Sequence, residues 1–235
     1  MHSERCQTGK AAIVRERCAI IAGMSRNNAR QTAMRARIAA AAARLMAEDG
    51  INDFALAKRK AARGLGAANT EALPGNDEIE AELRAYLALY QADEHPERLA
   101  ELRGLALQAM RALRRFNPYL TGPVLAGTAV PYAEIELQLF PESTKEVELF
   151  LLDRNIAYEA SDERRYSGDR ARAVAVISLD WQGVPLRLSV FDSRDERSAL
   201  KTTLAGRVTV RAGIAQVRAL VDIEPGESAD ESRPA

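Results

Sequence analysis

Two glutamates and an upstream glycine form a spacing that could do chemistry. Glu134 and Glu136 lie in the segment EIELQLF, whose alternation of polar and apolar residues predicts a strand. Residues two apart on a strand point to the same face, so we expect the two carboxylates side by side. Gly122 lies upstream in a predicted turn. Such a pair either binds a divalent metal ion or belongs to an ordinary solvated face of a sheet.

The composition excludes several kinds of site and partner. The chain has 235 residues with 33 basic and 33 acidic side chains, which argues against a nucleic-acid footprint over the whole protein. Its histidines are His2 and His95 and its cysteines are Cys6 and Cys18, too few for a metal site of histidine and cysteine. Carboxylates would therefore hold any metal ion, which favours Mg²⁺ or Mn²⁺. No apolar run is long enough to cross a membrane, and we expect a cytoplasmic protein.

Helical periodicity in the first half of the chain gives way to strand patterns from Tyr119 onward. We expect four helices, at 33–48, 54–65, 77–91 and 96–116, with Asp53 capping the second and Asn76 the third. We then expect a strand at 134–140 and a helix from Ser143 to Arg154, which a capping box with Glu146 opens. A short strand at 156–159 and an arginine-rich loop at 161–172 should follow. The last expected elements are a hairpin of 173–181 and 184–192, which turns at Gln182 and Gly183, and a helix at 213–222.

This order of elements predicts an α+β protein, with an N-terminal helical segment followed by a small mixed-sheet domain. The predicted organisation is a disordered leader at 1–33, a helical region at 34–117, the sheet domain at 118–222 and a disordered tail at 223–235.

The motif around the two glutamates resembles the signature of the DNA polymerase beta-like nucleotidyltransferase superfamily. Gly122 and Pro123 are followed by ten residues and then by the run from Glu134 to Glu136, at the start of a strand. The resemblance implies a nucleotidyltransferase-like palm that binds a nucleoside triphosphate (NTP). It further implies that Gly122 and Gly127 flank a phosphate-binding loop. Glu134 and Glu136 would then be the catalytic ligands of Mg²⁺ or Mn²⁺.

The sequence also departs from this signature. Pro123 stands where the family has serine or glycine, which removes a backbone donor and a hydroxyl. The family's third acid lies on a later strand, and the alternation of VPLRLSVFD puts Arg187 at that position, with Asp192 as the alternative in another register. We therefore predict a nucleotidyltransferase-like, NTP-binding protein, either active or catalytically degenerate, with no acceptor identified. The alternative is a non-catalytic binding or scaffold protein that retains the fold.

The N-terminal helices suggest a third hypothesis for the function. Residues 37–66 resemble the opening of TetR-type helix-turn-helix regulators, in which the next helix enters the major groove of DNA. Here the next helix carries Asp77, Glu78, Glu80 and Glu82 in its first turns, and DNA phosphates would repel them. DNA is therefore an unlikely partner. We expect instead that the basic first segment and the acidic helix dock on one another.

Overall fold

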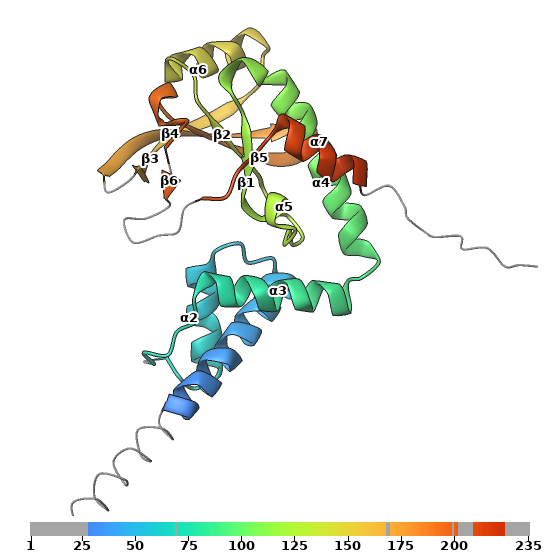
Figure 1. The fold of residues 1–235 in the computed structure, drawn as a ribbon, viewed down its shortest axis with the longest axis vertical. Coiled ribbons are helices and arrows are strands. Elements are labelled where there is room, and N and C mark those ends of the chain that lie inside the picture. The colour runs from blue at the N-terminus through green and yellow to red at the C-terminus, as the bar shows by residue number, and fades with distance from the viewer. Residues whose placement is uncertain (1–27, 69, 168–169, 199, 202–208, 224–235) are drawn as a thin grey trace, which may run out of the picture. The chain divides into compact units, whose positions relative to one another are not determined.

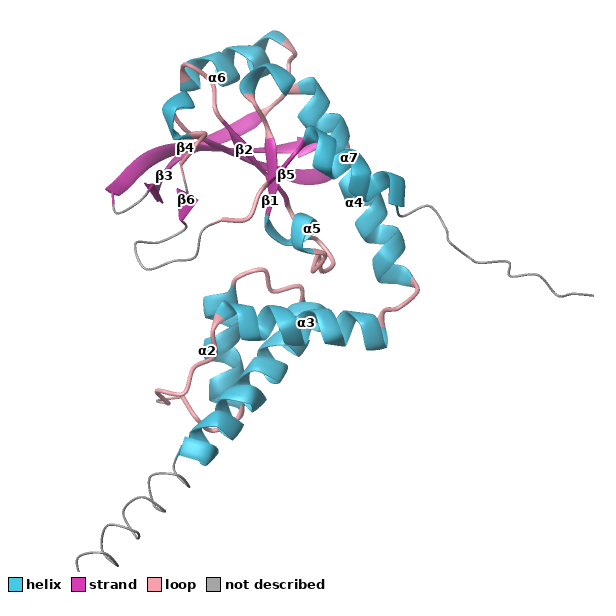
Figure 2. Ribbon diagram, viewed as in Figure 1, coloured by secondary structure: helices cyan, strands magenta, loops and turns pink. Residues whose placement is uncertain are grey.

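The structure, a computed structural model, describes residues 28–68, 70–167, 170–198, 200–201 and 209–223. It forms two compact units, Met1–Leu83 and Arg84–Ala235, each of which is described by itself. Helices come first and a mixed sheet follows, which confirms the predicted α+β class (Figures 1 and 2). Most of the predicted leader and tail lies outside the described residues, but 28–33 already belong to a helix.

The first unit contains a helix at 28–49, α2 (Phe54–Gly64) and the first half of α3 (Asn76–Tyr90). Asp53 caps α2 as predicted, because its carboxylate accepts a hydrogen bond from the backbone N–H of Ala55 at 2.7 Å. Asn76 is not the cap of α3, since it is the first helical residue. Glu78 instead reaches back one turn, and its Oε2 accepts from the N–H of Gly75 at 2.5 Å.

Charged side chains join the helices of this first unit. Arg35 Nη2 lies 2.7 Å from Glu78 Oε2, and Lys58 Nζ donates to Asn76 Oδ1 at 2.7 Å. The ion pair lowers the pKa of the Glu78 carboxyl, chiefly through the hydrogen bond from Arg35. The basic first segment and the acidic helix α3 therefore do dock on one another.

The second unit begins with the second half of α3 and contains the sheet. Its further elements are α4 (Glu94–Ala112), η1 (Arg114–Phe116), β1 (Tyr119–Thr121), α5 (Gly122–Ala126), β2 (Ile135–Leu139), α6 (Thr144–Asp153), β3 (Tyr158–Ser167), β4 (Arg170–Trp181), β5 (Val184–Val190), η2 (Ser193–Asp195), β6 (Leu200–Lys201), β7 (Ala212–Gly213) and α7 (Ile214–Ile223). The strand order is β6-β3-β4-β5-β2-β1-β7. β2 and β5 run parallel, and the other neighbours are antiparallel.

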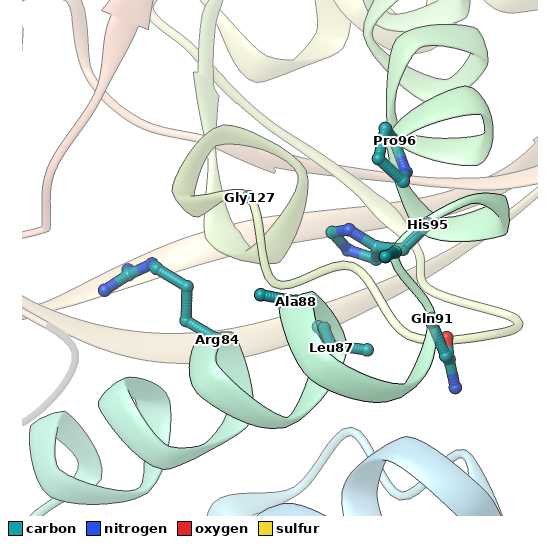
Figure 3. Close-up of a pocket in the computed structure, with 8 residues that line it drawn as sticks. Arg84, Leu87, Ala88, Gln91, His95, Pro96 and Gly127 are labelled. Atoms are coloured by element: carbon teal, nitrogen blue, oxygen red, sulfur yellow. The ribbon is translucent and has the colours of Figure 1, made fainter.

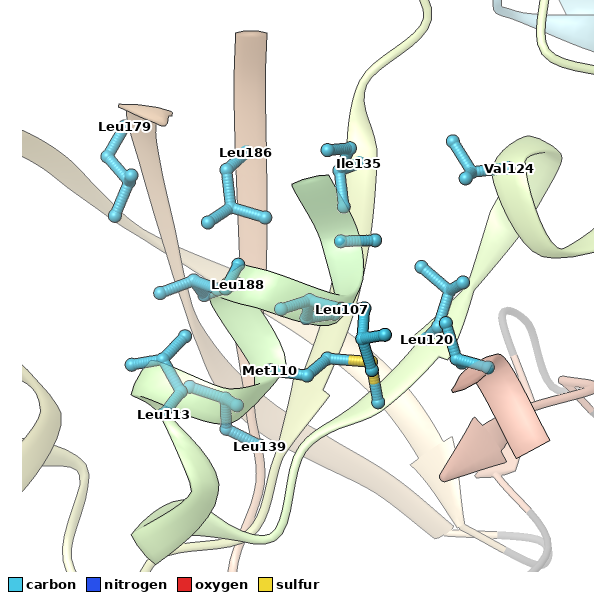
Figure 4. Packing of buried hydrophobic residues seen from close by; sticks show 14 of the residues in the cluster. Leu107, Met110, Leu113, Leu120, Val124, Ile135, Leu139, Leu179, Leu186 and Leu188 are labelled. Atoms are coloured by element: carbon cyan, nitrogen blue, oxygen red, sulfur yellow. The ribbon is translucent and has the colours of Figure 1, made fainter. Parts of the chain in front are cut away.

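Large apolar side chains from the helices and from one face of the sheet share a core (Figure 4). Leu107 and Met110 of α4 and Leu113, which caps this helix, belong to one cluster with Leu137 of β2 and Leu188 of β5. Since α4 belongs to this core, the units divide between Leu83 and Arg84, whereas the sequence suggested a boundary after residue 117. The available signal was the apolar face of α4, which has to pack against another element.

Two local predictions are wrong. The expected loop at 161–172 belongs largely to β3 and β4, which pair along their length from Tyr158 with Leu179 to Ser167 with Arg170. Backbone pairing in a ribbon does not require an apolar pattern, so the polar sequence concealed the strands. The capping box at Ser143 is also absent: the Glu146 N–H donates to the Ser143 carbonyl at 3.1 Å, and the Ser143 hydroxyl makes no capping bond.

Candidate functional site

A row of polar residues crosses the middle of the sheet. Thr121 on β1 pairs with Glu136 on β2, Glu136 pairs with Arg187 on β5, and Arg187 pairs with Ser178 on β4. Paired positions on adjacent strands point to the same face, so these four side chains lie beside one another. We call them the polar row.

Alternation along the strands places this row on the face away from the helical core. Leu186, Leu188 and Val190 of β5 are buried, whereas the intervening Arg187 and Ser189 are half-buried. In β2 the buried Ile135 and Leu137 likewise flank the half-buried Glu136. A carboxylate and a guanidinium therefore remain partly accessible at the centre of the sheet.

The residues that follow β2 and β5 cover a neighbouring part of the same face, around Tyr119. Phe140 stacks on Phe191, and Tyr119 meets Phe140 edge to face at 5.7 Å between ring centroids. The Tyr119 hydroxyl donates to Glu196 Oε1 at 2.9 Å, and this hydrogen bond raises the pKa of the phenol. Arg211 lies over the Tyr119 ring at 4.8 Å. This aromatic cluster closes one end of the face and leaves the polar row beside it.

Gly122 brings the main chain directly against Glu136. A Cβ atom at residue 122 would lie 2.7 Å from the carboxyl carbon of Glu136 and 2.8 Å from its Oε2. The φ angle of Gly122 is +71°, a region that other residues rarely adopt. The backbone conformation thus favours glycine here, where β1 ends and α5 begins, and any larger residue would displace the end of the Glu136 side chain.

The other predicted site residues do not all join this row. Glu134 lies one residue before β2 begins, so only Glu136 belongs to the strand on which both were predicted. Gly127 ends α5 in the left-handed conformation, and a Cβ there would face Arg103 Nη2 at 3.6 Å and Leu99 Cδ2 at 3.7 Å. Gly127 therefore faces α4, whereas Gly122 faces Glu136.

The buried Arg103 is a positioning residue that the sequence analysis missed. From α4 it donates through Nε to the carbonyl of Val124 at 3.2 Å and through Nη2 to that of Leu125 at 3.4 Å. These carbonyls lie near the C-terminus of α5, where a cation is favoured. The available signal was a charged residue at helical spacing within the apolar stripe of Leu99, Ala106 and Met110.

His95 lies at the start of α4, beside a cavity of about 320 Å³ that Gly127 also lines (Figure 3). The sequence predicted it exposed, but its side chain is buried. Burial lowers the pKa of its imidazole, the nearby Arg98 lowers it further, and a hydrogen bond with the backbone of Ala129 opposes them. Arg103 thus holds α5, and His95 contacts the start of the segment that joins α5 to β2.

The donor set at the polar row does not fit a two-metal centre. Arg187, a cation, is the register partner of Glu136 where a third carboxylate would be needed. The alternative Asp192 lies beyond the end of β5, and its carboxylate caps η2 by accepting from the N–H of Arg194 at 2.8 Å. Across the described part of the chain, no three histidine, cysteine, aspartate or glutamate side chains are grouped so that they could hold a metal ion.

Among the described residues, no helix combines the length and the apolar character needed to cross a lipid bilayer.

Comparison with known proteins adds no family to this geometry: no family model, curated protein or solved structure matches the chain.

Proposed function

We propose that this protein is a nucleotidyltransferase-like, NTP-binding protein whose catalytic centre is degenerate. The nucleotide would bind over the polar row, with its phosphates near Gly122 and Arg187. Arg187 supplies the positive charge that phosphate requires. The residues of the polar row do not make the two-metal site that nucleotidyl transfer uses, because Arg187 is the partner of Glu136.

The contact between Gly122 and Glu136 is the observation that carries this proposal. A Cβ atom on residue 122 would lie 2.7 Å from the Glu136 carboxyl carbon, and the residue also has a positive φ, so glycine lets the main chain pass close to this carboxylate. The connection through α5 returns the chain to β2 beside β1, so Gly122, which follows the last residue of β1, lies next to Glu136 on the adjacent antiparallel strand. This proximity of glycine and acid supports the proposal.

Arg187 decides between binding and catalysis. Opposite charges at paired positions of adjacent strands attract, so the arginine competes with a divalent cation for the Glu136 carboxylate. Glu134 and Glu136 alone would hold Mg²⁺ or Mn²⁺ weakly, because these ions prefer several oxygen ligands in regular geometry. We expect NTP binding with little or no nucleotidyl transfer.

Calorimetric titration of the full-length protein with the four NTPs and with Mn²⁺ tests the proposal. The wild type should bind NTPs and bind Mn²⁺ weakly. The Arg187→Asp variant should bind Mn²⁺ more tightly, since a ligand replaces a competing cation. The exposed Arg194→Asp change on η2 is the charge-matched control and should leave Mn²⁺ binding unchanged.

Two results would contradict the proposal in different ways. If no NTP binds to the wild type, the protein is not a nucleotide-binding protein. If the wild type releases pyrophosphate rapidly from NTPs, and Glu136→Gln abolishes this while Glu142→Gln does not, the centre is active and the degenerate assignment is wrong. Glu142 is an exposed carboxylate in the short loop between β2 and α6, which makes it a suitable control.

A further inference from the structure

Three buried polar atoms near the start of α4 have no hydrogen-bond partner within the described part of the chain. They are Gln91 Oε1, His95 Nε2 and Arg98 Nη1. The His95 N–H donates to the Gln91 carbonyl at 3.0 Å, so the chain already has helical geometry where it enters α4. Positions three and four residues apart lie on the same side of a helix, which brings the three side chains together. Buried polar groups are normally paired, so a cluster of three unpaired atoms requires an explanation.

Two of these residues line the cavity of about 320 Å³. The residues around the cavity all belong to the second unit, and none of them is a member of the polar row. Leu87, Ala88 and Pro96 give it apolar walls, and Gln91 and His95 supply polar groups. The His95 side chain is 9% exposed, and Figure 3 shows its ring directed into the group of residues that surrounds the cavity. A mostly apolar cavity of this size with a few polar groups is typical of a small-molecule site.

Positive charge surrounds this end of α4. Burial is the largest cause of the lowered pKa of His95, and the charges of Arg98 and Arg103 lower it further. Arg98 Nη2 lies 3.7 Å from Glu94 Oε2, but the Glu94 side chain is 81% exposed, so this ion pair compensates the arginine weakly. Arg84 also lines the cavity. An anionic group in the cavity would therefore be attracted by arginines and would meet a neutral imidazole, which can donate one hydrogen bond.

We propose that this cavity binds a small organic carboxylate with an apolar body. The carboxylate would accept hydrogen bonds from Arg98 and His95, and the body would lie against Leu87 and Ala88. Rotation of the Gln91 amide exchanges its oxygen and nitrogen, so this side chain can also donate to the carboxylate. An inorganic anion lacks an apolar body and would leave the walls of the cavity in water. The inference goes beyond the proposed function, because it concerns a second ligand at a separate site.

Imidazole nitrogen NMR of the isotope-labelled full-length protein tests this inference at His95 itself. The only other histidine of the chain is His2, and His95→Gln assigns the signals. Benzoate, which joins a carboxylate to an apolar ring, should shift the His95 signals in a saturable way. Benzyl alcohol has the ring without the charge, and inorganic phosphate has the charge without the ring. Each of these two probes should bind about tenfold more weakly than benzoate.

Two pairs of variants locate the binding. Ala88→Phe fills the cavity from an exposed position of α3, where the fold tolerates a larger side chain, and it should abolish the benzoate-dependent shift. Ala85→Phe is the matched control, at an exposed position of the same helix that does not line the cavity. Arg98→Gln should weaken benzoate binding about tenfold. Arg111→Gln, at an exposed arginine of α4, should leave it unchanged.

Each contrary result overturns a stated part of the inference. If millimolar benzoate shifts no His95 signal, the cavity is not a carboxylate site. If phosphate binds as tightly as benzoate, the apolar walls contribute nothing, and if benzyl alcohol does so, the arginines contribute nothing. Benzoate that still shifts His95 in Ala88→Phe binds somewhere other than the cavity. NTP binding is measured separately, so the proposed function and this inference can fail independently.

Discussion

The two units of the chain differ in the size of the side chains that fill their cores. Most of the buried apolar residues of the first unit are alanines, and the larger ones are Ile38, Met46, Ile79 and Leu83. The core of the second unit consists largely of leucine, isoleucine, valine and phenylalanine from the sheet and its helices. Small side chains let helices approach closely, whereas a sheet covered by helices needs large side chains to fill the space between layers.

The two units also differ in where their charged side chains lie. In the first unit the ion pairs lie on the surface, for example Arg35 with Glu78 and Lys60 with Asp49 at 2.6 Å, and join neighbouring helices. In the second unit Glu136 and Arg187 lie half-buried at the centre of a sheet, where charge is costly unless it is compensated. The comparison shows that the half-buried position of a charged pair, more than the presence of charge, marks a candidate site.

Shrinking a large core residue of the second unit should have the largest effect. Leu137→Ala on β2 removes a side chain that is 1% exposed and should lower the free energy of unfolding by about 2–5 kcal/mol. Urea unfolding measures this change. Leu89→Ala, at an exposed leucine of α3, should change it by less than about 0.5 kcal/mol. Equal losses for the two variants would show that the sheet core is not the stabilising element.

Enlarging a small core residue should damage the first unit. Ala42 is fully buried, so Ala42→Leu should force the helices apart and lower the free energy of unfolding by about 1–3 kcal/mol. The exposed Ala40 lies on the same helix, and Ala40→Leu provides the matched control. Circular dichroism during urea unfolding can follow both variants. A stabilised Ala42→Leu protein would mean that the alanine packing is loose.

The glycine beside Glu136 provides the third test. Gly122→Ala places a side chain at φ +71° and should lower the free energy of unfolding by about 1–2 kcal/mol. The new Cβ also displaces the flexible end of Glu136, so the variant should lose NTP affinity as well. Gly104→Ala within α4 meets open space, and should raise the free energy of unfolding by about 0.5–1 kcal/mol. A neutral Gly122→Ala change would remove the support for this site.

The smallest expected effect is the pH dependence due to His95. Its pKa in the folded protein lies below the ordinary value of 6.5, so the unfolded chain binds more protons between those two values. Stability should therefore fall as the pH drops through 6.5 toward the folded pKa. His95→Gln should reduce this dependence when unfolding curves are measured from about pH 7.5 to pH 5. The same slope in both proteins would assign the dependence to other groups.

Local patterns in the sequence determined much of the fold. The Asp53 cap and the hairpin turn at Gln182 and Gly183 are present as predicted, and a strand lies within the predicted segment EIELQLF, although it leaves out Glu134. These features depend on contacts between near neighbours or on the alternation of one strand, which a sequence records directly. The alternation of β5 also predicted the position of Arg187, and the register of β2 with β5 places it beside Glu136.

Only the tertiary structure decided which of the predicted site residues meet. Gly122 and Gly127 look equivalent in the sequence, yet one faces Glu136 and the other faces α4, because the five residues of α5 turn the chain between them. The roles of Arg103 and Ser178 follow from long-range contacts with α5 and β5. Such contacts join distant segments, and no local pattern specifies them.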